Sequence, residues 1–237
     1  MNNTHRTYIK PETEIIDIIR ENRCILLMLE HFNIDFSVGN KTAQHLCSEN
    51  GISLEAFLAI ANLYNSYYPD HNQPLPKESL LSIVSFLKNS HYYYRKDKYP
   101  ELIGYIKQLK ESTEDTKDIE LVEIFFTNYY NEVNEHLSYE DEVAFPFFLD
   151  LLNDTPQVSN NKFAVKDYTD HHSDIETKLE DLKSLFLNAI HLGTNLRIKR
   201  NFYNALSELE FDLKLHSIIE EMLLVPNIER IEIERNA

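Results

Sequence analysis

The sequence predicts an all-α protein, an antiparallel up-down-up-down four-helix bundle preceded by a small helical N-terminal domain. Only four glycines and eight prolines occur among 237 residues, which indicates long elements with few tight turns. Four long stretches in the second part of the chain carry apolar residues at helical spacing. The connections between them are short, and long amphipathic helices joined by short loops pack as antiparallel neighbours.

The small domain is expected to consist of short helices. Apolar residues at helical spacing predict a first helix over 12–32. Thr42 is a suitable N-cap for a second helix that ends near Gly51. A third helix is expected to start at Ser53 and to run to about Tyr64.

A proline-rich linker then divides the chain. Three prolines lie within residues 67–77, where they exclude a helix. The small domain therefore covers 1–66, and the bundle covers 78–237. The apolar spacing predicts four bundle helices, over about 77–109, 118–152, 163–190 and 196–224.

Charge and composition limit the classes of partner. The formal net charge of −16 argues against nucleic acid or an anionic membrane surface as a partner. The apolar stretch 24–29 is too short for an export signal or a membrane span, so a cytoplasmic location is expected. Cys24 and Cys47 form no CxxC pair and are expected as packed thiols in a reducing compartment. The sequence leaves the oligomeric state open, with a homodimer as one option.

A motif of histidine, glutamate and proline occurs twice, eighty residues apart. His136 precedes Glu140 by four residues, and His216 precedes Glu220 by the same spacing. In each copy a second acid follows the glutamate, and a proline lies ten residues after the histidine. Because residues four apart share one face of a helix, each copy presents an imidazole and a carboxylate to the same point.

Helical phase places one histidine on the apolar stripe of each predicted bundle helix. In the third helix two adjacent histidines compete, and phase selects His172 over His171 because Ile175 and Leu179 continue its stripe. The inward histidines are then His91, His136, His172 and His216.

Four imidazoles and two carboxylates in one core would be costly without a ligand that uses them, because an unsatisfied buried polar group costs about 1–3 kcal/mol. Imidazole and carboxylate without thiolate suit iron or manganese, and zinc less specifically. The four imidazoles and two carboxylates divide naturally between two ions that are bridged by both glutamates. Coordination positions are then left for an oxo or hydroxo bridge and for a small molecule. A ferritin-like site is disfavoured, since no histidine has a glutamate three residues before it. The predicted metal ligands are His91, His136, Glu140, His172, His216 and Glu220.

Over nearly its whole length the chain resembles the hemerythrin-like iron–sulfur cluster repair proteins, the RIC or ScdA/YtfE type of di-iron protein. Its segments 136–146 and 216–226 resemble that family's H-x-x-x-E-E-x-x-L-F-P signature. Segment 91–102 is similar to the first-helix motif H-x-x-x-R…L-P-E-L, with one extra residue before the proline. Segment 170–179 is similar to the third-helix E-H segment, an alignment that also selects His172 and puts His171 in the place of the family's acidic residue.

Two further features bear on the comparison with that family. Glu132, one turn before His136, is either an acid that supports the metal ligands from outside or a solvent-facing helix carboxylate. The segment 32–42 resembles the D-(F/Y)-C-C-x-G-x-x-(T/S) motif of the family's leading domain, but Ser37 and Val38 replace its two adjacent cysteines. If that thiol pair handles iron or electrons in the family, this chain cannot perform the step in the same way, and Cys47 is not expected to substitute.

The resemblance implies a centre of two iron ions and a role in the stress response, in which iron–sulfur clusters damaged by nitrosative or oxidative stress are repaired or protected. The implied partners are nitric oxide, oxygen or reactive oxygen species, and damaged iron–sulfur proteins. Whether the protein is an enzyme that reduces nitric oxide or oxygen stays open. The alternative is a hemerythrin-like protein that binds or senses oxygen or nitric oxide reversibly, and the missing cysteine pair favours it. A third interpretation is a purely structural bundle whose histidines coincide by chance.

Overall fold

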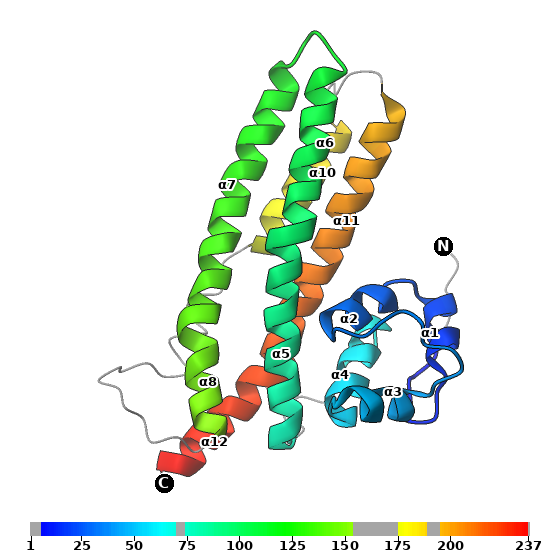
Figure 1. Cartoon of the computed structure of the whole chain (residues 1–237). Coiled ribbons are helices and arrows are strands. Elements are labelled where there is room, and N and C mark those ends of the chain that lie inside the picture. The colour runs from blue at the N-terminus through cyan, green and yellow to red at the C-terminus, as the bar shows by residue number, and fades with distance from the viewer. Residues whose placement is uncertain (1–5, 70–73, 154–174, 189–194, 237) are drawn as a thin grey trace. The chain divides into compact units, whose positions relative to one another are not determined.

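The computed structural model describes residues 6–69, 74–153, 175–188 and 195–236, and the regular elements over these ranges are helices (Figure 1). The predicted all-α class is therefore confirmed. Within these ranges the only other pairing is an isolated β-bridge between Glu14 and Thr42. None of the helices described here combines the length and the apolar character that a membrane crossing requires.

The N-terminal part contains four short helices. They are α1 (Ile15–Glu21), α2 (Ile25–His31), α3 (Ala43–Asn50) and α4 (Leu54–Tyr64). The expected single helix over 12–32 is wrong, since the chain leaves helical geometry between α1 and α2. Asn22 causes the break: its buried side chain donates to the backbone oxygen of Tyr64 at 2.9 Å and accepts from the N–H of Cys24 at 3.1 Å.

The expected caps of the next two helices are confirmed. The Thr42 hydroxyl accepts the N–H of His45, and the Ser53 hydroxyl accepts the N–H of Ala56. Gly51 ends α3 with a φ of 65°, a left-handed conformation that glycine adopts without steric cost. These side chains and Gly51 satisfy backbone groups that a helix end otherwise leaves exposed.

Three long helical runs of about 35 to 40 residues follow. In each run a five-residue π-helical segment separates two α-helices. The first is α5 (Lys77–Tyr93), η1 (Tyr94–Lys98) and α6 (Tyr99–Glu111); the second is α7 (Lys117–Tyr139), η2 (Glu140–Ala144) and α8 (Phe145–Leu152); the third is α11 (Leu196–Ile219), η3 (Glu220–Leu224) and α12 (Val225–Asn236). The third run was expected to end near residue 224, and it continues for a further α-helix. Of the predicted helix over 163–190, the structure describes α10 (Ile175–Asn188).

Prolines explain the position of the π segments. Pro100, Pro146 and Pro226 are each the second residue of the α-helix that follows a π segment. Proline has no N–H, and its ring clashes with the carbonyl four residues earlier, so a regular α turn cannot continue through it. A π turn contains one extra residue, and the N–H of Tyr99 reaches back five residues to the oxygen of Tyr94 just before Pro100. The helix therefore passes each proline instead of ending there.

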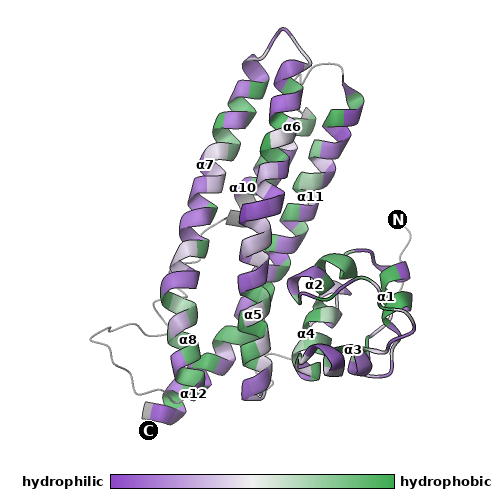
Figure 2. Ribbon diagram, in the orientation of Figure 1, coloured by the Kyte–Doolittle hydropathy of each residue, from purple (hydrophilic) through white to green (hydrophobic). Residues whose placement is uncertain are grey.

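The chain divides into two compact units. The first comprises Met1–Ser90, Phe145–Val165 and Leu215–Ala237. Within it the N-terminal helices pack on α5, where the rings of Phe32 and Phe86 lie 4.8 Å apart. Its helices α2, α4 and α8 are rich in apolar residues (Figure 2).

The second unit comprises His91–Ala144 and Lys166–Lys214. Within it α7 packs against both α6 and α10. Aromatic residues fill the contact between α6 and α7, with the rings of Tyr99 and Phe126 5.9 Å apart. The η1 segment, by contrast, is mostly hydrophilic (Figure 2), and its charged side chains form the polar network described below.

Candidate metal site

Five predicted ligands fall at the ends of α-helices, where π segments begin. His91, His136 and His216 lie in the last turns of α5, α7 and α11, while Glu140 and Glu220 are the first residues of η2 and η3. The side chains of His91, Glu140, His216 and Glu220 are buried, and that of His136 is 13% exposed. The apolar stripes inferred from the sequence thus coincide with buried positions on these three helical runs.

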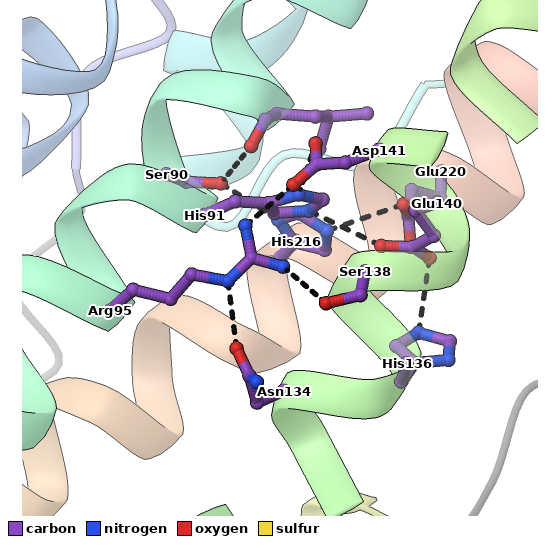
Figure 3. A network of polar contacts seen from close by, with 11 residues as sticks. Ser90, His91, Arg95, Asn134, His136, Ser138, Glu140, Asp141, His216 and Glu220 are labelled. Atoms are coloured by element: carbon purple, nitrogen blue, oxygen red, sulfur yellow. Dashed lines mark hydrogen bonds and ion pairs between the residues drawn. The ribbon is translucent and has the colours of Figure 1, made fainter. Parts of the chain in front are cut away.

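Three of the predicted ligands form one group. Ligand atoms of His91, Glu140 and His216 lie within 4.8 Å of one another (Figure 3). All three residues are buried, so water competes poorly for their ligand atoms. This His/Glu/His group could hold a metal ion.

The carboxylate of Glu140 faces two imidazoles. Its Oε2 lies 3.2 Å from Nε2 of His91, and its Oε1 lies 3.0 Å from Nε2 of His136. In the second copy of the motif, Oε1 of Glu220 lies 3.2 Å from Nε2 of His216. The four-residue spacing in the sequence thus brings each imidazole onto its own glutamate.

The outer ring nitrogens of His91 and His216 are held by neighbouring side chains. Nδ1 of His91 donates to Oδ1 of Asp141 at 3.0 Å. Nδ1 of His216 lies 2.9 Å from the hydroxyl of Ser90, and this hydroxyl donates its own proton to the carbonyl of Leu87. A hydroxyl carries one proton, so Ser90 accepts from His216. Both rings therefore carry a proton on Nδ1 and turn Nε2 toward a glutamate.

This donor set fits a metal cation. An imidazole with its neutral-state proton on Nδ1 has a lone pair on Nε2, and a carboxylate oxygen offers further lone pairs. Two such atoms about 3 Å apart attract each other only if a proton or a metal cation supplies positive charge between them. Buried carboxylates also need a cation to offset their desolvation. Nitrogen and oxygen donors of this kind suit iron, manganese or zinc.

Asp141 is ionised beside the site. Burial alone would raise the pKa of its carboxyl, but the hydrogen bonds from His91 and Arg95, together with the Arg95 charge, outweigh burial and lower that pKa below its ordinary value. Arg95 contacts Oδ2 of Asp141 at 2.6 Å. A fixed negative charge therefore lies against the outer nitrogen of His91.

The structure places the remaining predicted residues as follows. The carboxylate of Glu132 is 43% exposed and forms an ion pair with Lys178. His171 and His172 lie outside the described residues. Ser37 is exposed and Val38 is buried, and burial raises the pKa of the Cys47 thiol to about 12.

The sequence did not assign roles to four other residues around the site. Asp141, Arg95 and Ser90 contact the outer nitrogens of the histidines directly or through one another. Asp212, fully buried in α11, accepts a hydrogen bond from Tyr94 at 2.8 Å. The signal that could have identified Arg95 and Asp212 is their spacing, since each lies four residues from a predicted histidine ligand.

Comparison of the chain with protein-family models and with curated proteins gave no match.

Proposed function

We propose that this chain is a hemerythrin-like, non-haem di-iron protein that repairs or protects iron–sulfur clusters damaged by nitrosative or oxidative stress. The buried group of His91, Glu140 and His216 is the observation that carries the proposal. In this proposal the three long helical runs and the helix containing α10 form the antiparallel bundle. The repair role is supported by the resemblance of the sequence motifs to the repair family.

Two ions would be held by the six predicted ligands. Those are His91, His136, Glu140, His172, His216 and Glu220. Iron bound by imidazole and carboxylate supplies one-electron chemistry and open positions for a small molecule such as nitric oxide or oxygen. The two glutamates offset the positive charge of the ions, and burial of the ligands limits the access of water.

The chain's own side chains prepare the ligands for this task. Asp141 and Ser90 fix the orientation of the His91 and His216 rings, so Nε2 of each ring faces the site. Such outer partners orient metal ligands and increase their basicity. The charge of Asp141 does this for His91 and the neutral hydroxyl of Ser90 for His216.

A reversible gas-binding protein is the second candidate. Ser37 and Val38 replace the cysteine pair of the repair family, and the Cys47 thiol has a pKa of about 12. A thiol with such a pKa is protonated near neutral pH and does not act as a metal ligand or nucleophile. A chain that lacks the family's adjacent cysteine pair, and whose Cys47 thiol stays protonated, suits binding of oxygen or nitric oxide at the same centre.

Two measurements test the centre and its role. Iron and manganese analysis of the natively purified chain should give about two metal ions per chain, and Glu140→Gln together with His216→Ala should lower that content. The iron-loaded chain should then restore the activity of a damaged [4Fe–4S] dehydratase beyond the level reached with free ferrous iron. Less than about one metal ion per chain would support the purely structural interpretation.

The same preparation separates repair from gas binding. A sensor should bind oxygen or nitric oxide reversibly in stopped-flow spectra, without turnover. No gain in dehydratase activity over free ferrous iron, together with reversible binding, would replace the repair proposal with the second candidate.

A further inference from the structure

A chain of polar contacts leads from Arg95 to His91. The Arg95 guanidinium donates to Oδ2 of Asp141 at 2.6 Å, and Oδ1 of Asp141 accepts from Nδ1 of His91 at 3.0 Å. Nε2 of the same ring faces Glu140 at 3.2 Å. One charged side chain on η1 is thus connected, through one carboxylate and one imidazole, to the group that could hold the metal (Figure 3).

Arg95 is itself held in one orientation. Its Nε donates to the Asn134 amide oxygen at 2.8 Å, and a terminal nitrogen donates to the Ser138 hydroxyl at 3.2 Å. Asn134, Ser138 and Asp141 follow one another at steps of four and three residues, so they share one face of α7 and η2. A guanidinium has several donors in a rigid plane, and three acceptors on one face fix that plane.

In the second copy of the motif the outer ring nitrogen contacts a hydroxyl group instead of a carboxylate. There His216 contacts the neutral hydroxyl of Ser90. Glu221, which follows Glu220 as Asp141 follows Glu140, is exposed. The two histidines therefore present the same nitrogen to the site, but Nδ1 contacts a carboxylate in His91 and a hydroxyl group in His216.

We propose that Asp141 and Arg95 are positioning residues that strengthen His91 as a metal ligand. The proposal rests on the metal centre described under Proposed function. Asp141 orients the ring and increases electron density on its inner nitrogen, and Arg95 holds Asp141 in place.

The physical reason is the position of the charge. A carboxylate that accepts the outer N–H of a ligating histidine stabilises the positive charge that the ring acquires on binding a cation. Loss of such an outer partner typically lowers metal affinity about 10–100-fold. The side chains of Arg95 and Asp141 are 24% and 21% exposed, so their interaction is only partly screened by solvent. A hydroxyl in the same place supplies orientation without the charge.

The test compares variants of the full chain. The affinity for ferrous ion is measured without oxygen by competition with a chromophoric chelator, and the thermal midpoint of each metal-free variant reports folding. Asp141→Asn should weaken ferrous-ion binding about 10–100-fold, and Arg95→Gln, which acts through Asp141, about 3–10-fold. Arg95→Lys keeps the positive charge but not the planar set of donors. It should therefore bind ferrous ion more tightly than Arg95→Gln and less tightly than the wild-type chain. Ser90→Ala should weaken binding less than Asp141→Asn.

Lys98→Gln is the matched control. Lys98 lies in the same π segment as Arg95 and pairs with Glu101 at 2.7 Å and Glu208 at 2.5 Å. Its replacement should change the thermal midpoint and leave ferrous-ion affinity within about twofold, because it contacts neither Asp141 nor His91.

Each outcome decides the proposal. Equal losses of ferrous-ion affinity in Arg95→Gln and Lys98→Gln would show that any change in η1 weakens metal binding. That result would overturn the proposal. Wild-type affinity in folded Asp141→Asn and Arg95→Gln chains would overturn it while leaving the metal centre intact. If Asp141→Asn does not fold, the Arg95→Gln and Arg95→Lys pair decides in the same way. A wild-type chain that binds no divalent metal ion would overturn both this proposal and the proposed function.

Discussion

Replacing Tyr94 by phenylalanine should destabilise the protein through one buried hydrogen bond. The Tyr94 hydroxyl donates to Oδ2 of Asp212 at 2.8 Å, and both residues are buried, at 0% and 1% exposure. Tyr94 lies three residues after His91, and Asp212 lies four residues before His216. This hydrogen bond therefore connects η1 to α11, next to the turns that carry predicted ligands.

The expected magnitude follows from burial and charge. Phenylalanine keeps the ring, so the change removes a donor without creating a cavity. A hydrogen bond to a charged group contributes about 1.5–3 kcal/mol, and water has little access to replace it. For a chain of this size, each kcal/mol shifts the thermal midpoint by about 2–4 °C. Tyr94→Phe should thus lower the midpoint by roughly 3–12 °C.

Tyr93→Phe is the matched control. Tyr93 also donates to a carboxylate of α11, Oε1 of Glu208 at 3.1 Å, but the Glu208 side chain is 50% exposed. Water can replace that bond, so the cost should stay within about 0.5 kcal/mol. Urea unfolding followed by circular dichroism gives both free energies, and a double-mutant cycle with Asp212→Asn isolates the pair. Equal costs for the two tyrosines would refute the reasoning from burial.

The remaining predictions concern thiols, histidines and one glutamate. At pH 8 an alkylating reagent should modify Cys24 at least about a thousandfold faster than Cys47, because a pKa of about 12 leaves roughly one Cys47 thiol in ten thousand as thiolate. The rate at which Cys47 is modified should rise about tenfold per pH unit. Mass spectrometry can measure both rates. His172→Ala should lower iron content and His171→Ala should largely keep it; the reverse result would contradict the helical phase. Glu132→Gln breaks a partly exposed ion pair with Lys178, so it should cost about 0–1 kcal/mol of unfolding free energy and leave metal content unchanged, whereas loss of metal would show that Glu132 supports the ligands.

Much of the fold and part of the site could be predicted because they depend on helical period. The spacing of apolar residues identifies the inward face, and a histidine on that face is buried with its neighbours; His91 and His216 illustrate this. The four-residue step to Glu140 and Glu220 also depends on geometry within one turn. The helical repeat alone was sufficient to predict these contacts, because the two residues of each pair lie about one turn apart on the same helical run.

The rest depends on contacts between distant segments, which no local pattern reports. The break between α1 and α2 is set by Asn22, whose amide reaches Tyr64 and Asn65 more than forty residues away. Ser90 supports His216 across 126 positions of sequence. The end expected near residue 224 was wrong for a different reason: proline usually ends a helix, but here a π segment lets α12 continue past Pro226.

The three π segments also restrict which changes of chain length the protein can tolerate. Each segment holds the one residue by which a π turn exceeds an α turn, and one residue corresponds to about 100° of rotation around a helix. A deletion between Glu140 and Pro146, or between Glu220 and Pro226, would rotate α8 or α12 by that angle and turn its apolar face to solvent. Homologous chains should therefore vary in length in their connections, while the distance from each glutamate to its proline stays constant.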